Sequence, residues 1–187
     1  YERCCRNNNI QNIQTEFKAN SGQTFYLEFP PVIKNGRPFV DTTPILFPPL
    51  SDYAIVNRPF YFDFSGTDPD GDSLAYSLTL PLNASDTTRG IPSEPSSAPY
   101  PNVELADGIT LDNLIPGNPS LRVNQDGLIT VTPADLGLYV FSMKVEEFRD
   151  GEKIGEVQRD FQMYVIDADP GETPRVQAKV KGESYFY

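Results

Sequence analysis

Short runs in which apolar and polar residues alternate dominate the middle of the chain. The clearest run is at Phe60, Phe62 and Phe64, whose spacing of two puts the aromatic rings on one face of a strand. Similar runs occupy residues 74–78, 121–123, 128–131, 139–145 and 161–165. Asp126-Gly127 and Asp150-Gly151 separate consecutive runs, and an Asp-Gly pair tolerates the positive φ of a tight hairpin turn. The pattern predicts short antiparallel strands joined by tight turns.

Composition agrees with this pattern. The 187 residues include 13 Gly and 18 Pro, which would break long helices repeatedly. Ten Tyr and 12 Phe supply the bulk that a core without Trp requires. Many short strands with frequent turn signals are typical of a two-sheet β-sandwich. The predicted fold class is therefore all-β, with an immunoglobulin-like sandwich as the architecture.

Four regions can be distinguished along the chain. The strand patterns place one β-sandwich domain at 51–168, preceded by a Pro-rich extended connector at 34–50. Residues 1–33 echo the spacing of 145–166, and we interpret them as the closing hairpin of a preceding, similar domain. Residues 169–187 are predicted to be a linker and the first strand of a following domain.

Charge and residue usage exclude several function classes. The formal net charge of −11 repels phosphate backbones and anionic lipid, so nucleic acid and membrane surfaces are unsuitable partners. No apolar stretch is long enough for a membrane-spanning helix. The absence of His removes Ser-His-Asp triads and His-ligated metals. We expect a protein that is not an enzyme.

One motif carries recognisable chemistry, the run Asp68-Pro69-Asp70-Gly71-Asp72. Three carboxylates at alternate positions, bent by Pro and Gly, can converge on Ca²⁺, which takes six to eight oxygen ligands. An EF-hand is excluded, because Ser73 and Thr79 stand where its loop needs Gly and Glu. The same residue types also favour an ordinary solvated turn, and the residues alone leave both interpretations open.

Glu146 and Glu147 are expected beside these aspartates. In an immunoglobulin-like sandwich the loop after the second strand and the loop after the sixth lie at the same end. Glu147 continues the inward face of the strand at 139–145, and an inward carboxylate needs a partner. A calcium ion could be the partner of this carboxylate, and so could Arg159. The predicted metal ligands are therefore Asp68, Asp70, Asp72 and Glu147.

Several separated segments resemble one class of proteins. The run 67–78 resembles the Asp-x-Asp-Gly-Asp-x-Leu-x-Tyr segment of cadherin-like and PKD-like domains in large bacterial surface proteins, and 126–140 is similar to their closing half. More narrowly, Cys4-Cys5-Arg6-Asn7, 146–151 and 159–162 resemble repeats of giant proteins of gliding Bacteroidetes, which are exported by the type IX secretion system.

The resemblance implies a location and a role. It implies an extracellular, cell-surface module of an adhesin or filament that uses Asp68, Asp70 and Asp72 to bind calcium. Its partners would be neighbouring domains of the same chain or identical subunits, and possible ligands are surface glycans. One alternative is a calcium-dependent carbohydrate-binding module that uses the excursion at 83–119. Another is an accessory domain of a secreted enzyme.

The cysteines leave alternatives open. Cys4 and Cys5 are adjacent, a geometry that strains a bond between them. Each is expected either to pair with a cysteine outside this sequence or to be free. The cysteines that relatives carry near 53–56 and 165–168 are absent here, so packing or a metal must contribute more of the stability.

Overall fold

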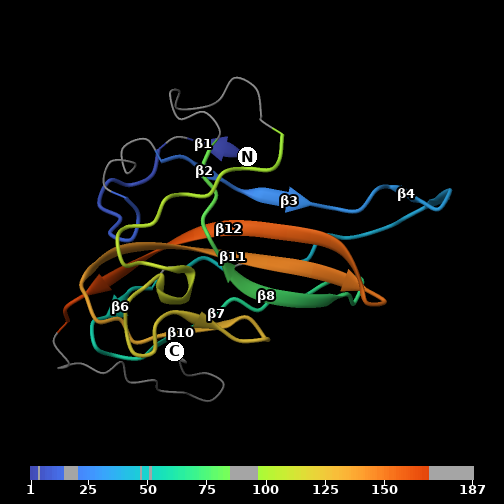
Figure 1. Ribbon diagram of the computed structural model, residues 1–187. Coiled ribbons are helices and arrows are strands. Elements are labelled where there is room, and N and C mark those ends of the chain that lie inside the picture. Colours follow the sequence, from blue (N-terminus) through green and yellow to red (C-terminus); the bar gives the residue numbers. More distant parts are fainter. Residues whose placement is uncertain (4, 15–20, 47, 51, 85–96, 169–187) are drawn as a thin grey trace, which may run out of the picture.

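The computed structural model describes residues 1–3, 5–14, 21–46, 48–50, 52–84 and 97–168 (Figure 1). In this part of the chain the regular structure is β, apart from one 3₁₀ turn at Leu111–Asn113, and there is no α-helix. The strands are β1 (Glu2–Arg3), β2 (Gln23–Thr24), β3 (Tyr26–Glu28), β4 (Ile33–Lys34), β5 (Arg37–Pro38), β6 (Ala54–Ile55), β7 (Phe60–Asp63), β8 (Ser73–Thr79), β9 (Arg122–Val123), β10 (Leu128–Val131), β11 (Gly137–Arg149) and β12 (Glu152–Ile166).

Two sheets form the body of the molecule. The larger has the order β3-β12-β11-β8, with β6 pairing parallel to β12 at its far end, and the smaller has the order β7-β10-β9. The other strand pairs are antiparallel, including the short pairs β1-β2 and β4-β5. The prediction of a mostly β protein with antiparallel strands and tight hairpins is therefore confirmed.

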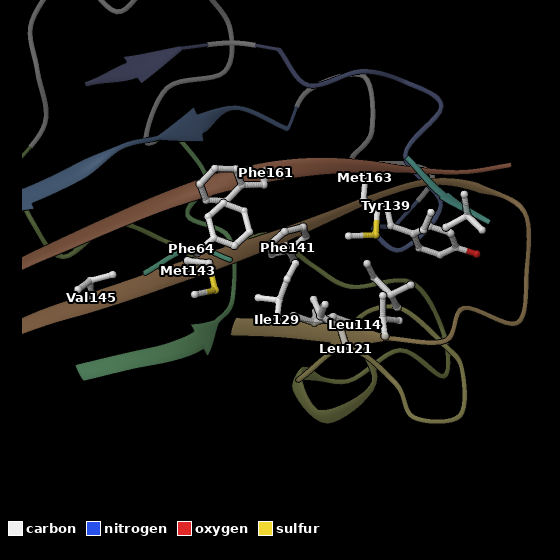
Figure 2. Close-up of a cluster of buried hydrophobic side chains, with 14 residues drawn as sticks. Phe64, Leu114, Leu121, Ile129, Tyr139, Phe141, Met143, Val145, Phe161 and Met163 are labelled. Atoms are coloured by element: carbon white, nitrogen blue, oxygen red, sulfur yellow. The ribbon is translucent and has the colours of Figure 1, made fainter. Parts of the chain in front are cut away.

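The hydrophobic core lies between these two sheets (Figure 2). Phe64 follows β7 and is fully buried against the rings of Phe141 and Phe161, with centroid distances of 6.2 and 4.5 Å. The remaining buried members are Ala54, Leu114, Ile115, Leu121, Ile129, Val131, Tyr139, Met143, Val145, Met163 and Val165. The period-two alternation thus identified the core-facing side of both long strands.

Strand β11 is buried on both faces. Its second face packs Leu138 and Val140 against Ile10 and Ile13 of the N-terminal segment. Strand β8 pairs only with residues 142–148, so the edge of β11 before Ser142 needs other hydrogen-bond partners. The buried Asn12 side chain accepts from the N–H of Val140 at 2.9 Å and donates to its carbonyl at 2.7 Å. Asn12 thereby continues the ladder where β8 ends.

A buried ion pair also fastens the N-terminal segment. Arg6 and Asp160 form a salt bridge, and their side chains are 0% and 4% exposed. Arg6 also donates to the carbonyls of Gly22 at 2.7 Å and Leu82 at 2.8 Å. Burial raises the pKa of Asp160, and the Arg6 charge opposes that shift. The described parts of 1–33 thus pack on β11 and β12. Their assignment to a preceding domain stays a prediction, as do the other domain boundaries.

The Pro-rich connector contains a hairpin that the sequence analysis did not predict. Strands β4 and β5 are joined by Asn35 and Gly36, which have φ of 54° and 74°. Asn-Gly is a strong signal for a two-residue hairpin turn. The segment is therefore not uniformly extended, and in Figure 1 its hairpin reaches away from the two sheets.

We predict that replacing Arg6 with Leu destabilises the protein by about 3–5 kcal/mol, because the buried Asp160 carboxylate then lacks its partner. Arg3→Leu, at an exposed position in the same segment, is the control and should change stability by less than about 0.5 kcal/mol. Urea unfolding measures both. The Arg6→Leu, Asp160→Leu double variant should recover much of the loss, and equal effects of Arg6→Leu and Arg3→Leu would contradict a structural role for the pair.

Candidate metal centre

Three segments far apart in the sequence meet at one end of the molecule. They are the loop between β7 and β8, the end of β11 with its hairpin turn, and the segment 39–46 that follows the β4-β5 hairpin. The pairing of Phe148 with Ser73 sets the loop aspartates beside the end of β11. The predicted convergence of Asp68–Asp72 with Glu147 is therefore present in the structure.

The loop aspartates form a turn, but the turn does not use all of their oxygens. Oδ1 of Asp68 accepts from the backbone N–H of Asp70 at 2.8 Å and of Asp72 at 3.0 Å. Gly71 has a φ of +85°, which suits a residue without a Cβ. Oδ2 of Asp68 is buried and has no hydrogen-bond partner in the described part of the chain. An ordinary turn therefore accounts for Oδ1 of Asp68 but leaves the burial of Oδ2 unexplained.

Glu147 lies inward, as its place in the alternating pattern predicted. It is 5% exposed, and its Oε1 is buried without a hydrogen-bond partner among the described residues. A register shift between Glu147 and Phe148 interrupts the ladder here. Gly155 lies opposite on β12, where a Cβ would come within 2.9 Å of Oε2 of Glu147. A side chain at position 155 would therefore crowd the carboxylate.

The surroundings of Glu147 disfavour the charged form of its carboxyl group. Burial raises its pKa to about 8, and the neighbouring charges of Asp41, Asp68 and Asp72 act in the same direction. A small cavity of about 10 Å³, lined in part by Asp41 and Leu46, lies beside it. Such a volume is about the size of one water molecule. The Glu147 carboxylate thus faces other acidic side chains across a space that holds one water-sized molecule or ion.

Arg149 partly neutralises this group. Its Nε donates to Asp72 at 2.8 Å and its Nη2 to Asp41 at 2.7 Å, while Asp70 lies 3.5 Å away. These contacts hold the pKa of Asp72 below its usual range. The pKa of Asp41 is nevertheless raised, chiefly by burial. One guanidinium therefore compensates only part of the local negative charge.

The sequence analysis missed both Asp41 and Arg149. Asp41 lies in the Pro-rich segment, where no periodic pattern marked it, and Arg149 directly precedes the predicted Asp150-Gly151 turn, where it was given no role of its own. Arg159 was the alternative partner predicted for Glu147. Instead, the Arg159 guanidinium lies over the rings of Phe25 and Phe161, at 5.8 and 5.6 Å from their centroids. That alternative is therefore not supported.

Within the described ranges, two sets of carboxylates could hold a metal ion. Asp68, Asp70 and Asp72 form one, and Asp41, Asp72 and Glu147 form the other, with ligand atoms within 4.8 Å of one another in each. Asp72 belongs to both, so the sets are continuous. Glu146 points elsewhere, to Lys144 at 3.4 Å and Lys153 at 3.1 Å. Of the adjacent glutamates, only Glu147 takes part.

Other predicted features have simpler outcomes. Cys5 is disulfide-bonded rather than free, while Cys4 lies outside the described residues. Residues 85–96 of the excursion at 83–119 also lie outside them, but Tyr100 contacts Tyr26 edge-on, with ring centroids 6.2 Å apart. Within the described ranges, no helix is long and apolar enough to cross a bilayer.

Comparison with known proteins gives no match: no family model, no curated protein and no solved structure is significantly similar to this chain.

We predict that, without divalent cations, stability falls as the pH rises from about 4.5 to about 8. The folded state holds a proton on Glu147 that the unfolded chain releases above pH 4.5, so the unfolded state gains relative stability until the folded-state pKa is passed. Glu147→Gln mimics the protonated side chain and should flatten this decline. Urea midpoints at several pH values in EDTA measure it.

The control for this prediction is Glu146→Gln. Lysine contacts, led by Lys153, lower the pKa of Glu146, so its replacement should leave the decline between pH 4.5 and 8 in place. Identical pH profiles for wild type and Glu147→Gln would show that Glu147 does not titrate in this way.

Proposed function

We propose that this chain is a non-catalytic structural or adhesive module of a secreted bacterial surface protein, stiffened at one end by calcium. The observation that carries the proposal is a pair of buried carboxylate oxygens, Oε1 of Glu147 and Oδ2 of Asp68, which lie in one acidic cluster and have no hydrogen-bond partner among the described residues. Buried polar atoms without partners are rare in folded proteins, and a bound ion is one established reason for them.

The ligand types favour calcium among common metals. The site offers carboxylate oxygens from Asp68, Asp70, Asp72 and Glu147, with Asp41 as an additional candidate. Ca²⁺ takes six to eight oxygens in flexible geometry, and backbone carbonyls or water can complete such a shell. Sites for zinc use Cys or His, and this sequence has no His. A divalent ion would add the positive charge that Arg149 alone does not provide.

The strand order supports an immunoglobulin-like, cadherin- or PKD-like sandwich. In such folds one sheet contains the second, fifth and fourth strands, and the facing sheet contains the third, sixth and seventh. The sheets β7-β10-β9 and β8-β11-β12 fit this arrangement, with β6 in the place of the first strand. In this proposal calcium joins the β7-β8 loop, the end of β11 and the connector, and thereby fixes how the module meets its neighbour.

A location at the cell surface completes the proposal. Its support is the resemblance of residues 67–78 to cadherin-like and PKD-like domains of large bacterial surface proteins, and of residues 146–151 to repeats of type IX-secreted, gliding-associated Bacteroidetes proteins, together with a net charge of −11 and the acidic cluster. The partners are neighbouring domains or identical subunits. An accessory domain beside an enzyme would share this architecture, and a catalytic neighbour in the full gene would distinguish it.

We expect millimolar CaCl₂ to raise the melting temperature by several degrees relative to EGTA. With a Kd of about 0.1 mM and calcium at about 10 mM, binding to the folded state alone adds about 2.7 kcal/mol. Glu147→Gln and Asp68→Asn should each remove most of the shift. Asp150→Asn is the control, because Asp150 occupies the nearby turn outside both carboxylate sets. A wild-type melt unchanged by calcium would refute the proposed site.

A carbohydrate-binding module is the second candidate. A hollow of about 220 Å³ is lined by Tyr26, Tyr100, Pro99, Glu156 and other residues, and aromatic rings beside a carboxylate are a common surface for sugars. This candidate predicts glycan-array binding that Tyr100→Ala abolishes and Tyr53→Ala, at an exposed site elsewhere, preserves. Glycan binding equal in both variants, or absent from the wild type, would exclude this hollow as the site.

A further inference from the structure

An apolar arm projects from the edge of the larger sheet. We define the docking arm as residues 29–40, which contain the β4-β5 hairpin and extend away from both sheets in Figure 1. Phe29, Val32, Ile33 and Val40 are 66%, 76%, 64% and 76% exposed. Isolated exposed apolar residues are normal on a protein surface, but four large ones within this short arm make it a candidate interaction surface.

Contacts within the arm and at its base hold this surface in shape. Phe39 donates from its backbone N–H to the carbonyl of Val32 at 2.9 Å, and its ring lies under the Lys34 ammonium at 5.1 Å. The Arg149 guanidinium donates to the carbonyl of Val40 at 2.9 Å and lies 5.0 Å from the Phe39 ring centroid. Lys34 also forms an ion pair with Glu152 at 2.8 Å. A surface held in place before binding loses less entropy when a partner arrives.

The charge of the arm indicates its partner. The arm contains Lys34 and Arg37 and no acidic residue, whereas the whole chain has 26 Asp and Glu against 15 Lys and Arg. Arg37 makes no ion pair within the described ranges. A basic, apolar arm on an acidic protein is complementary to another copy of the same protein.

A matching groove lies beside the base of the arm. It has a volume of about 480 Å³ at the outer strand β3, and its lining includes the apolar residues Phe25, Leu27, Pro44, Leu46 and Val157, with Arg159 as a charged member. Among the described residues β3 pairs only with β12, so its other edge can accept an extended partner.

An acidic residue borders this groove, and the chain enters and leaves the arm there. Glu28 on β3 is exposed, so its carboxylate lies where a basic side chain could approach, whereas Glu156, its partner in register, is already paired with Lys153. Leu27 and Pro44 of the groove lie just before and just after the arm in the sequence. Because the arm and the groove are neighbours, two copies can exchange arms about a two-fold axis.

We propose that the docking arm of one copy of this chain binds the groove at β3 of a second copy, with Val32 and Ile33 in the groove and Arg37 near Glu28. The inference names a partner for the structural module and to that extent rests on the proposed function. The two can fail separately, because self-association is measured by mass and the calcium site by melting.

Sedimentation velocity of the full chain between about 1 and about 100 µM tests the contact, a range that covers transient interfaces. Wild type should form a dimer, and the Val32→Asp, Ile33→Asp double variant should weaken association at least tenfold. Leu27→Asp in the groove should do the same. The matched control is Leu136→Asp, Tyr164→Asp, which adds the same charges at sites of similar exposure outside the arm and groove.

Calcium-dependent melting of each variant checks that the fold and the acidic cluster remain intact. A mixture of the arm variant and the groove variant should associate better than either alone, because one native arm can still meet one native groove. A wild type that stays monomeric, or association equal in the arm variant and its control, would overturn the proposal. That result would leave the calcium shift, and hence the proposed function, standing.

Discussion

One inward-facing carboxylate determines the arrangement at the acidic end of the molecule. Glu147 continues the core face of β11, where the preceding inward residues are apolar, and its Oε1 finds no hydrogen-bond partner in the part of the chain that the structure describes. Three features surround this one carboxylate. They are the register shift after Glu147, the glycine opposite it and the approach of Asp41. Because an unpaired buried charge is costly, the site must either hold a proton there or supply a cation.

The same long strand connects this end with the rest of the fold. Strand β11 is covered on one face by the core and on the other by the N-terminal segment, whose Asn12 completes its hydrogen bonding. The Arg6–Asp160 pair fixes that segment to β12. The docking arm is fastened at its base by Arg149, which also contacts the acidic cluster. The arm and the candidate metal centre therefore share one side chain, and replacing Arg149 itself is expected to affect both.

The alternation of apolar and polar residues along the sequence predicted the features that depend on local pattern. It identified β7, β8, β11 and β12, the turns at Asp126-Gly127 and Asp150-Gly151, and the inward direction of Glu147. It missed Asp41 and Asn12, because each acts through contacts with residues distant in the sequence and neither lies in a periodic run. The Asn35-Gly36 pair is a hairpin-turn signal in the sequence, but the surrounding prolines favoured the prediction of an extended connector. The ion pairs of Arg149 depend on the strand register beside a bulge, which no local pattern specifies.

The most direct test of the calcium site is a crystal structure from crystals grown in millimolar CaCl₂, with anomalous scattering recorded at a long wavelength. Our account predicts an anomalous peak about 2.3–2.6 Å from carboxylate oxygens of Glu147 and Asp68, with Asp72 also coordinating. It would be contradicted if no peak lay within this cluster and both buried oxygens were instead hydrogen-bonded to water or to protein groups.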